Sequence, residues 1–336
     1  MSIGRVQFTH RYEHIISLEN LLSAWSEFVI GKKSRKDVQI FQQNLMRNII
    51  SLHKDLITKN YKHSEYEAFN ISDSKPRNIH KASVRDRLLH HAIYRQLYPF
   101  FDKTFISDSY SCRFNKGTQK AIKAFHRYSE KISQNGTRKV WVLKCDVRRF
   151  FASIDQSILI DIIDSYISDK DIVWLISQIV KSFYITEGVG LPLGNLTSQL
   201  LVNVYMNKCD QFVKHKIKAK YYIRYADDFV ILSENKEWLL SILPRIQDFL
   251  EEKLKLHLHP NKISITNLAL GLDLLGWVHF TDHKVLRTVT KKRMFKNIEI
   301  SEGKEEVVQS YIGLLSHGNT KKLRNKLIGG LVYTYD

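Results

Sequence analysis

The sequence predicts a protein of the α+β class, in which helices precede and cover an antiparallel or mixed sheet. Apolar residues recur at helical spacing through much of the first part of the chain. From residue 140 the predicted order is strand, helices, hairpin, helix and strand pair, which is typical of a sheet backed by helices. The glycines around Gly188 lack the strand-to-helix GxGxxG context, and the chain contains no GxxxxGK(S/T) segment. Neither a Rossmann sheet nor a P-loop fold is therefore expected.

Helical periodicity dominates the residues before 140. Ser17 is a suitable N-cap for the first amphipathic stretch, and a basic connector, 31–36, separates it from the second. The segment 66–79 partly alternates and contains Pro76, which suits a short hairpin. We expect helices over 18–29, 38–49, 86–97 and 121–132, with a loop over 109–118.

The second part of the chain mixes strands and helices. An apolar strand ends at Asp146, and helical segments continue to about Tyr184. A glycine-rich loop over 188–194 precedes a long helix. The further elements expected are a helix over 196–216, a hairpin over 221–232, a helix over 242–254, a strand, turn and strand over 270–288, and a basic helical tail from Lys291.

Charge and cysteine usage restrict the partners. The 336 residues carry a formal net charge of +18, which favours nucleic acid, since binding phosphates releases counterions. An anionic membrane is the rival partner, but no run of about 18 apolar residues is present to span a bilayer. Cys112, Cys145 and Cys209 are scattered without a CxxC pair, which predicts reduced thiols in a cytoplasmic protein without a zinc site.

Two acidic motifs carry the predicted chemistry. Asp146 ends an apolar strand, and Asp227 and Asp228 lie in the turn of an apolar hairpin. Carboxylates beside apolar strands are costly unless something neutralises them. Three of them converging would suit a two-metal phosphoryl-transfer site, with two Mg²⁺ ions about 4 Å apart and Mn²⁺ as an alternative ion. The plain alternatives are an Asx-type turn for the pair and a helix N-cap for Asp146.

The ordered motifs resemble those of reverse transcriptases over roughly residues 15 to 330. Tyr225-Ala226-Asp227-Asp228 resembles the YxDD box, and 146–155 resembles the first palm motif. The loop and helix start at 190–199 resemble the segment beneath the incoming nucleotide. Segments 77–81 and 85–87 resemble the basic finger motifs, and Leu274-Leu275-Gly276-Trp277 resembles the primer grip.

The resemblance implies a right-hand polymerase made of fingers, palm and thumb with a helical N-terminal extension. The expected divisions are an extension over 1–70, fingers over 71–139, a palm with inserted helices over 140–280, and a thumb over 281–336.

One departure from the common pattern narrows the family. Most reverse transcriptases carry Gln before the glycine of this loop, whereas this chain has Leu193 before Gly194. That feature resembles the reverse transcriptases of diversity-generating retroelements, bacterial or phage-encoded enzymes that copy a template-repeat RNA with errors opposite adenine. Bacterial antiviral-defence reverse transcriptases are an alternative. A non-catalytic RNA-binding module is the alternative from another class, and Phe151 disfavours an RNA-dependent RNA polymerase.

The resemblance assigns roles around the predicted metals. Asp146 and Asp227 would bind both ions, the Val147 carbonyl would add an oxygen ligand, and Asp228 would complete the site. Lys262 matches a lysine near the leaving pyrophosphate and would serve as a general acid, unless it is a plain surface lysine.

The nucleotide-binding residues implied by the resemblance come from three segments. Lys81 and Arg87 would clamp the triphosphate, or else form a solvated basic face. The backbone amides of Arg149 and Phe150 would donate to phosphate oxygens. Phe151 would stack beneath the sugar and exclude a 2′-hydroxyl, with core packing as the alternative. Leu193 and Gly194 would lie against the nascent base pair, where Leu193 lacks the hydrogen bonds of Gln; loop packing is the alternative.

Template and primer contacts complete the expected site. Arg77 would contact template or nucleotide. The primer grip would comprise Leu275, Gly276 and Trp277, and the thumb would grip the duplex through Lys321, Lys322 and Arg324. The partners implied are structured template RNA, cDNA, dNTPs and a small helical accessory protein that is itself oligomeric, with no membrane.

Overall fold

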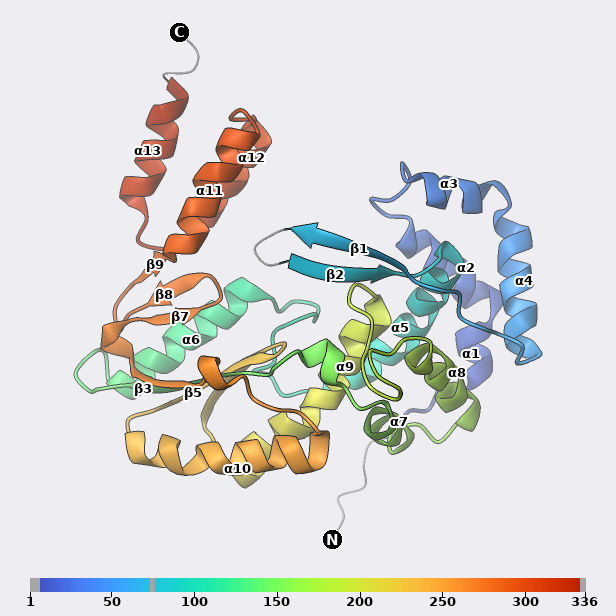
Figure 1. Cartoon of the computed structure of the whole chain (residues 1–336), viewed down its shortest axis with the longest axis horizontal. Helices are drawn as coiled ribbons and strands as arrows, with labels where there is room; N and C mark the ends of the chain where they lie inside the picture. Colours follow the sequence, from blue (N-terminus) through green and yellow to red (C-terminus); the bar gives the residue numbers. More distant parts are fainter. Residues whose placement is uncertain (1–6, 73–75, 333–336) are drawn as a thin grey trace.

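A computed structural model describes residues 7–72 and 76–332 of the chain, and side chains are described up to residue 327. Four N-terminal helices open it, and Figure 1 shows them gathered at one end of the molecule. They are α1 (Tyr12–Ile16), α2 (Leu18–Phe28), α3 (Lys36–Gln43) and α4 (Leu45–Ile57). The Ser17 side chain accepts a hydrogen bond from the Asn20 amide, which confirms the predicted N-cap of α2. The buried face of α2 includes Leu21 and Phe28 and packs on α5 (Val84–Thr104).

A two-stranded hairpin follows and projects from the helices toward the other side of the molecule (Figure 1). It pairs β1 (Glu67–Ser72) with β2 (Pro76–Lys81), and the register places Glu67 opposite Lys81. Pro76 begins β2, where a missing amide donor is tolerated. The boundary expected at residue 70 falls within β1, and the division into extension and fingers stays a prediction. The next long helices are α5 and α6 (Thr118–Ser133).

The central sheet is antiparallel with the strand order β4-β5-β3-β6. Its strands are β3 (Trp141–Asp146), β4 (Tyr221–Tyr225), β5 (Asp228–Ser233) and β6 (Ser264–Asn267). Alternate residues of a strand point to opposite faces. Val142 and Val230 therefore pack with α6, whereas Leu143 and Ile231 join the core on the other face. Helices α9 (Leu196–Gln211) and α10 (Lys236–Leu254) belong to that second core, so both faces of the sheet are covered.

The helices inserted after β3 belong spatially with the N-terminal helices. Short turns of 3₁₀ helix, η1 (Phe150–Ser153), lead into α7 (Gln156–Asp164) and α8 (Lys170–Lys181). The Tyr12 amide donates to Asp169 at 2.8 Å, and Phe8 forms an isolated β-bridge with Ile167. The chain thus returns to the N-terminal helices before α9. A π-helical turn, η2 (Phe212–Lys216), extends α9 to the end predicted for it.

The last part of the chain differs from the expected strand pair. Segments η3 (Pro260–Lys262) and η4 (Leu268–Leu270) flank β6. Three short strands then form an antiparallel sheet: β7 (Leu272–Leu274), β8 (Trp277–His279) and β9 (Lys284–Leu286). The predicted helical tail consists of α11 (Thr288–Ile300), α12 (Glu305–Leu315) and α13 (Lys321–Val332), which stand apart from the other helices in Figure 1.

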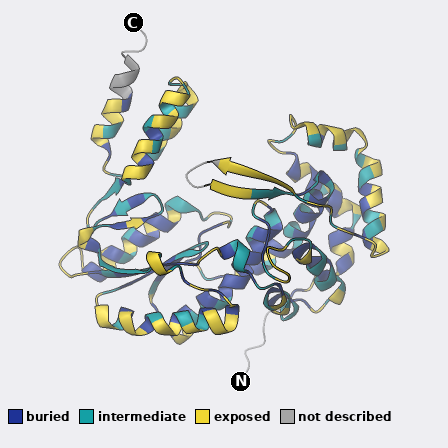
Figure 2. Ribbon diagram, in the orientation of Figure 1, coloured by how far each residue is buried: buried dark blue, intermediate teal, exposed yellow. Residues whose placement is uncertain are grey.

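Burial differs between the central helices and the C-terminal helices (Figure 2). The helices α9 and α5 are buried along much of their length, whereas α11, α12 and the described part of α13 keep exposed outer faces. Among the described residues, no helix is both long and apolar enough to cross a membrane.

Candidate active site

The three predicted catalytic carboxylates lie at one end of the central sheet. The register of β3 and β5 places Asp146 directly opposite Asp228. Tyr225 pairs with Asp228 across β4 and β5, so Ala226 and Asp227 form a two-residue turn. The Val147 amide donates to the Asp227 carbonyl at 3.1 Å, which fixes that turn against the end of β3. Folding thus brings together two motifs that lie about 80 positions apart in the sequence.

The electrostatics of this end are those of a crowded acidic cluster. Burial raises the pKa of Asp228 to about 7; Lys144 opposes the shift, while Asp227 and a hydrogen bond with Asp146 add to it. Lys262 donates from Nζ to Oδ1 of Asp146 at 2.6 Å. Lys262 therefore lies beside the acidic cluster, and its predicted role near the leaving pyrophosphate stays a prediction.

The donor set fits divalent cations in kind. Mg²⁺ prefers carboxylate and carbonyl oxygens, and this end of the sheet offers both kinds. Asp146, Asp227, Asp228 and the Val147 carbonyl are the groups that would hold the ions. Within residues 7–72 and 76–332, no group of three or more Asp, Glu, His or Cys side chains is arranged so that it could hold a metal ion. The carboxylates are gathered, and their closure around a cation remains a prediction.

Lys81 and Arg87, the two predicted triphosphate-binding cations, meet at a shared acidic partner. Nζ of Lys81 lies 3.0 Å from Oδ2 of Asp37, and Nη2 of Arg87 lies 2.5 Å from the same oxygen. Glu67 is a second partner of Lys81 at 3.4 Å. Asp37 could not be predicted as part of this site from the sequence, because nothing near it in the α3 sequence indicates partners about 50 residues away.

Lys81 and Arg87 line a hollow of about 290 Å³ between the hairpin, α5 and the start of α9. Two further cations, Lys32 and Arg35, come from the connector between α2 and α3. Gly194 also lines the hollow, so three of the predicted nucleotide-binding residues share one surface.

The loop before α9 is attached to the β1–β2 hairpin through its backbone. The His80 amide donates to the Leu193 carbonyl at 3.0 Å, and the Asn195 side chain donates to the His80 carbonyl at 3.2 Å. A Cβ on Gly194 would come within 2.8 Å of Ile79, and its φ of 111° also favours glycine. Leu193 is half-buried, and its position against a base pair stays a prediction.

The turn after β3 presents the remaining nucleotide-binding candidates. Arg149 is exposed and has a φ of 46°, Phe150 is buried, and Phe151 is half-buried. The Phe151 carbonyl accepts a hydrogen bond from the Leu191 amide at 2.8 Å, which connects this turn to the glycine-rich loop. A half-buried ring is compatible with both predicted roles of Phe151, stacking and packing.

The predicted primer grip lies at the turn between β7 and β8, and its role stays a prediction. Leu275 and Gly276 form the turn between β7 and β8 and have φ values of 51° and 85°. Trp277, however, is 1% exposed in a core with Leu286, Met294 and Leu315, so its ring has no surface to offer a primer. A Cβ on Gly318 would come within 2.1 Å of that ring. Trp277 therefore anchors the C-terminal helices, because a large ring stabilises most when it is buried.

The other template and primer candidates are exposed. Arg77 lies on β2, and Lys321, Lys322 and Arg324 lie on α13. Their side chains are accessible to a phosphate backbone, and no contact among the described residues assigns them further.

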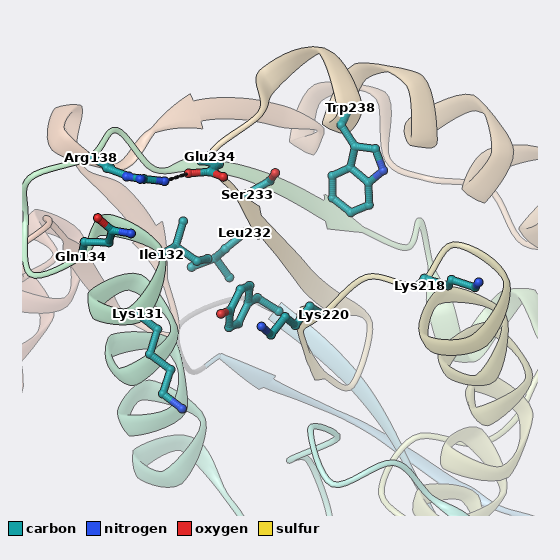
Figure 3. Close-up of a pocket in the computed structure, with 11 residues that line it drawn as sticks. Lys131, Ile132, Gln134, Arg138, Lys218, Lys220, Leu232, Ser233, Glu234 and Trp238 are labelled. Atoms are coloured by element: carbon teal, nitrogen blue, oxygen red, sulfur yellow. Dashed lines mark hydrogen bonds and ion pairs between the residues drawn. The ribbon is translucent and has the colours of Figure 1, made fainter.

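A second basic hollow, of about 400 Å³, lies at the opposite end of the β4–β5 hairpin (Figure 3). Tyr221 and Ser233 line it at the strand ends remote from the Asp227 turn. The cations around it are Lys131, Arg138, Lys218 and Lys220. Arg138 pairs with Glu234 at 2.9 Å. None of the predicted site residues lines this hollow, which is therefore separate from the acidic cluster.

Comparison with known proteins places most of the chain in one family. Residues 62–304 match the family described as reverse transcriptase (RNA-dependent DNA polymerase). Protein YkfC of Escherichia coli (strain K12) is 24% identical over 254 residues, covering 64% of this chain and 65% of YkfC. The group II intron-encoded protein LtrA of Lactococcus lactis subsp. cremoris is 24% identical over 293 residues, covering 67% of this chain and 47% of LtrA.

The chain thus spans 65% and 47% of the lengths of these two relatives. Among solved structures, an apo telomerase from Candida tropicalis, truncated from its C-terminal domain, is similar with a TM-score of 0.48 and 14% identity. That similarity covers 72% of this chain and 60% of the telomerase chain.

Proposed function

This chain belongs to the reverse transcriptase (RNA-dependent DNA polymerase) family, and we propose that it copies a template-repeat RNA into cDNA as the error-prone polymerase of a diversity-generating retroelement. The observation that carries the polymerase assignment is the meeting of Asp146 and Asp228 across β3 and β5, with Asp227 in the adjoining turn. A non-catalytic RNA-binding module has no need for three carboxylates at one end of a buried sheet, where their mutual repulsion is costly.

The residues of the site have different proposed roles, according to their positions. The three carboxylates and the Val147 carbonyl are the groups that would hold two Mg²⁺ ions, whose chemistry would be activation of the attacking hydroxyl and charge stabilisation at the leaving pyrophosphate. Lys262 carries a proton at Nζ beside Asp146 and supplies it to the leaving group. Lys81 and Arg87 bind the triphosphate, and Phe151 restricts the space at the sugar.

Incorporation of dNTPs tests the polymerase assignment. The purified chain, given a DNA primer annealed to an RNA template with Mg²⁺, should extend the primer with dNTPs. RNA binding without incorporation would favour the RNA-binding module instead. A strong preference for NTPs would contradict the assignment of Phe151 to sugar selection.

The retroelement assignment depends on Leu193 in the loop bound to β2. Leu offers only shape where Gln offers hydrogen bonds, and each hydrogen bond contributes about 1 kcal/mol net, or several-fold in discrimination. Leu193→Gln should therefore lower misincorporation opposite template adenine by several-fold, with little change in rate. Sequencing of cDNA made on one template measures this. Leu270→Gln is the matched control, because Leu270 is an exposed leucine on η4.

An unchanged error spectrum in Leu193→Gln would make Leu193 a packing residue. The antiviral-defence alternative would then be as well supported as the retroelement assignment. The proposal also includes a cytoplasmic bacterial or phage setting and a small oligomeric helical accessory protein as partner. Co-purification of the tagged chain with the product of a neighbouring small reading frame tests that partner.

A further inference from the structure

A fully buried arginine lies directly behind the acidic turn. Arg224 is on β4, two residues before Ala226, and both Arg224 and its partner Asp210 on α9 are 0% exposed. Nε of Arg224 donates to Oδ1 and Oδ2 of Asp210 at 2.8 and 3.0 Å, and Nη2 donates to Oδ2 at 2.7 Å. The hydroxyl of Tyr222 also donates to Oδ1 of Asp210 at 2.7 Å. The ion pair is therefore bidentate and shielded from water, and the Asp210 carboxylate is oriented by Nε and Nη2 of Arg224 and by the Tyr222 hydroxyl.

The remaining donors of the guanidinium reach the acidic turn and its surroundings. Nη1 donates to the carbonyl of Ala226 at 3.0 Å and to Oδ1 of Asn203 at 3.1 Å. Nη2 donates to Oγ of Ser109 at 3.0 Å. Every N–H group of Arg224 thus has an acceptor, and one acceptor is the peptide group between Ala226 and Asp227.

That turn needs an external restraint. Ala226 has a φ of 56°, a left-handed conformation that costs a non-glycine residue roughly 1 kcal/mol. The turn also holds two adjacent carboxylates opposite Asp146, and like charges repel. The backbone of Arg224 is itself fixed, because its amide donates to the Asp108 carbonyl at 2.9 Å and its carbonyl accepts from the Tyr110 amide at 3.0 Å.

We propose that Arg224, oriented by Asp210, is a positioning residue that holds the Ala226–Asp227 turn in the shape needed to present its carboxylates to the cations. The proposal deepens the proposed polymerase function and rests on it. A buried ion pair is often no more stabilising than apolar residues of similar volume. A role in core packing alone would therefore not require a guanidinium that also holds the carbonyl of the acidic turn.

The test separates positioning from packing. The double variant Arg224→Met with Asp210→Leu removes both charges together and keeps an apolar core, so it should fold. Loss of an outer-shell partner of a metal site typically lowers metal affinity or activity about 10- to 100-fold. We expect that loss in kcat and a higher Mg²⁺ concentration for half-maximal extension, with the KM for dNTP and RNA binding unchanged. Arg224→Lys, which keeps one charge but loses the planar fork, should show part of the same defect.

Ser109→Ala is the matched control, because it removes a contact of the same guanidinium that does not reach the turn. It should retain wild-type extension and Mg²⁺ dependence. Wild-type kcat and Mg²⁺ dependence in the folded double variant would overturn the proposal and leave Arg224 as a packing residue.

A direct titration with Mn²⁺, followed by electron paramagnetic resonance, keeps the two proposals distinguishable. If the wild-type chain binds Mn²⁺ but does not extend a primer, the proposed function fails while positioning can still be measured. Weaker Mn²⁺ binding in the double variant than in Ser109→Ala would support positioning, and equal binding in the two would reject it.

Discussion

Two groups of paired charges differ in their contact with water. One is Arg224 with Asp210, beneath the acidic turn. The other is Asp37 with Lys81 and Arg87, beside the β1–β2 hairpin. Arg224 and Asp210 are fully buried, and every donor of the arginine is engaged. Asp37 and Lys81, by contrast, are each 32% exposed in their side chains, and Arg87 is 14% exposed. Exposed ion pairs contribute little, whereas breaking a buried pair is strongly destabilising.

If both regions bind substrate as proposed, the difference in burial predicts that they are prepared for it in different ways. The palm turn is shaped by folding itself, because its supporting pair is already complete. Beside the β1–β2 hairpin, Asp37 on α3 already pairs with Lys81 and Arg87. An anionic ligand of these two cations would compete with Asp37. A triphosphate carries more charge than one carboxylate and offers more acceptor oxygens, so it can replace Asp37 at modest cost.

The largest expected effect comes from removing the carboxylates at the acidic end of the sheet, which the Arg224–Asp210 pair supports. Asp227→Asn, and separately Asp146→Asn, should abolish primer extension, because each removes a carboxylate predicted to bind both cations. RNA binding should stay near wild type. Asp282→Asn is a suitable control, since Asp282 has 83% of its side chain exposed. Extension comparable to wild type in either variant would reject the two-metal assignment.

Unfolding in denaturant compares the two charge groups directly. Asp210→Asn should lower the free energy of unfolding by about 3–5 kcal/mol, because it leaves Arg224 buried without its counter-charge. Asp37→Asn should change it by only about 1 kcal/mol, because this ion pair is still partly in contact with water. Similar losses of unfolding free energy in the two variants would mean that solvent exposure does not set the strength of the two groups of ion pairs.

Nucleotide kinetics sharpen the finger side of the comparison. Lys81→Ala should raise the KM for dNTP several-fold, because a predicted phosphate contact is lost. Asp37→Asn should lower that KM by a few-fold, within the roughly 0.2–1 kcal/mol measured for exposed pairs, because a competing anion is removed. A KM that rises in Asp37→Asn as much as in Lys81→Ala would instead make Asp37 a residue that orients the two cations for binding.

A pH dependence of stability is expected for the metal-free protein. The pKa of Asp228 is raised from 3.8 to about 7, so the folded state holds a proton that the unfolded state releases. The stability contributed by this group is full below pH 4 and is lost as the pH rises through 7. Thermal unfolding in EDTA should therefore show a decline in stability between about pH 4 and 7 that is smaller in Asp228→Asn.

Mg²⁺ should counteract that decline in the wild-type protein, since cations bind the deprotonated carboxylate. The same decline in Asp228→Asn as in wild type would assign the pH dependence to another group.

The sequence was informative wherever a local pattern carried the structure. The apolar strand before Asp146, the hairpin around Asp227 and the long helix after Gly194 lie where periodicity and turn residues predicted them. The tail was less well predicted: three strands replace the expected pair over 270–288, because strands of three residues are too short to show an alternating pattern. The inserted helices α7 and α8 were predicted as helices, but their packing on the N-terminal helices was not.

What the sequence by itself determined is the kind of chemistry: carboxylates at the ends of apolar strands, a large positive charge, and a basic segment at the fingers. Tertiary structure alone decided which of these groups meet. It placed Asp37 beside Lys81 and Arg87, joined Arg224 to Asp210 and the turn, and buried Trp277 under the C-terminal helices. Periodicity reports only which face of an element is apolar, whereas the partner of a charge or a ring depends on how distant elements pack.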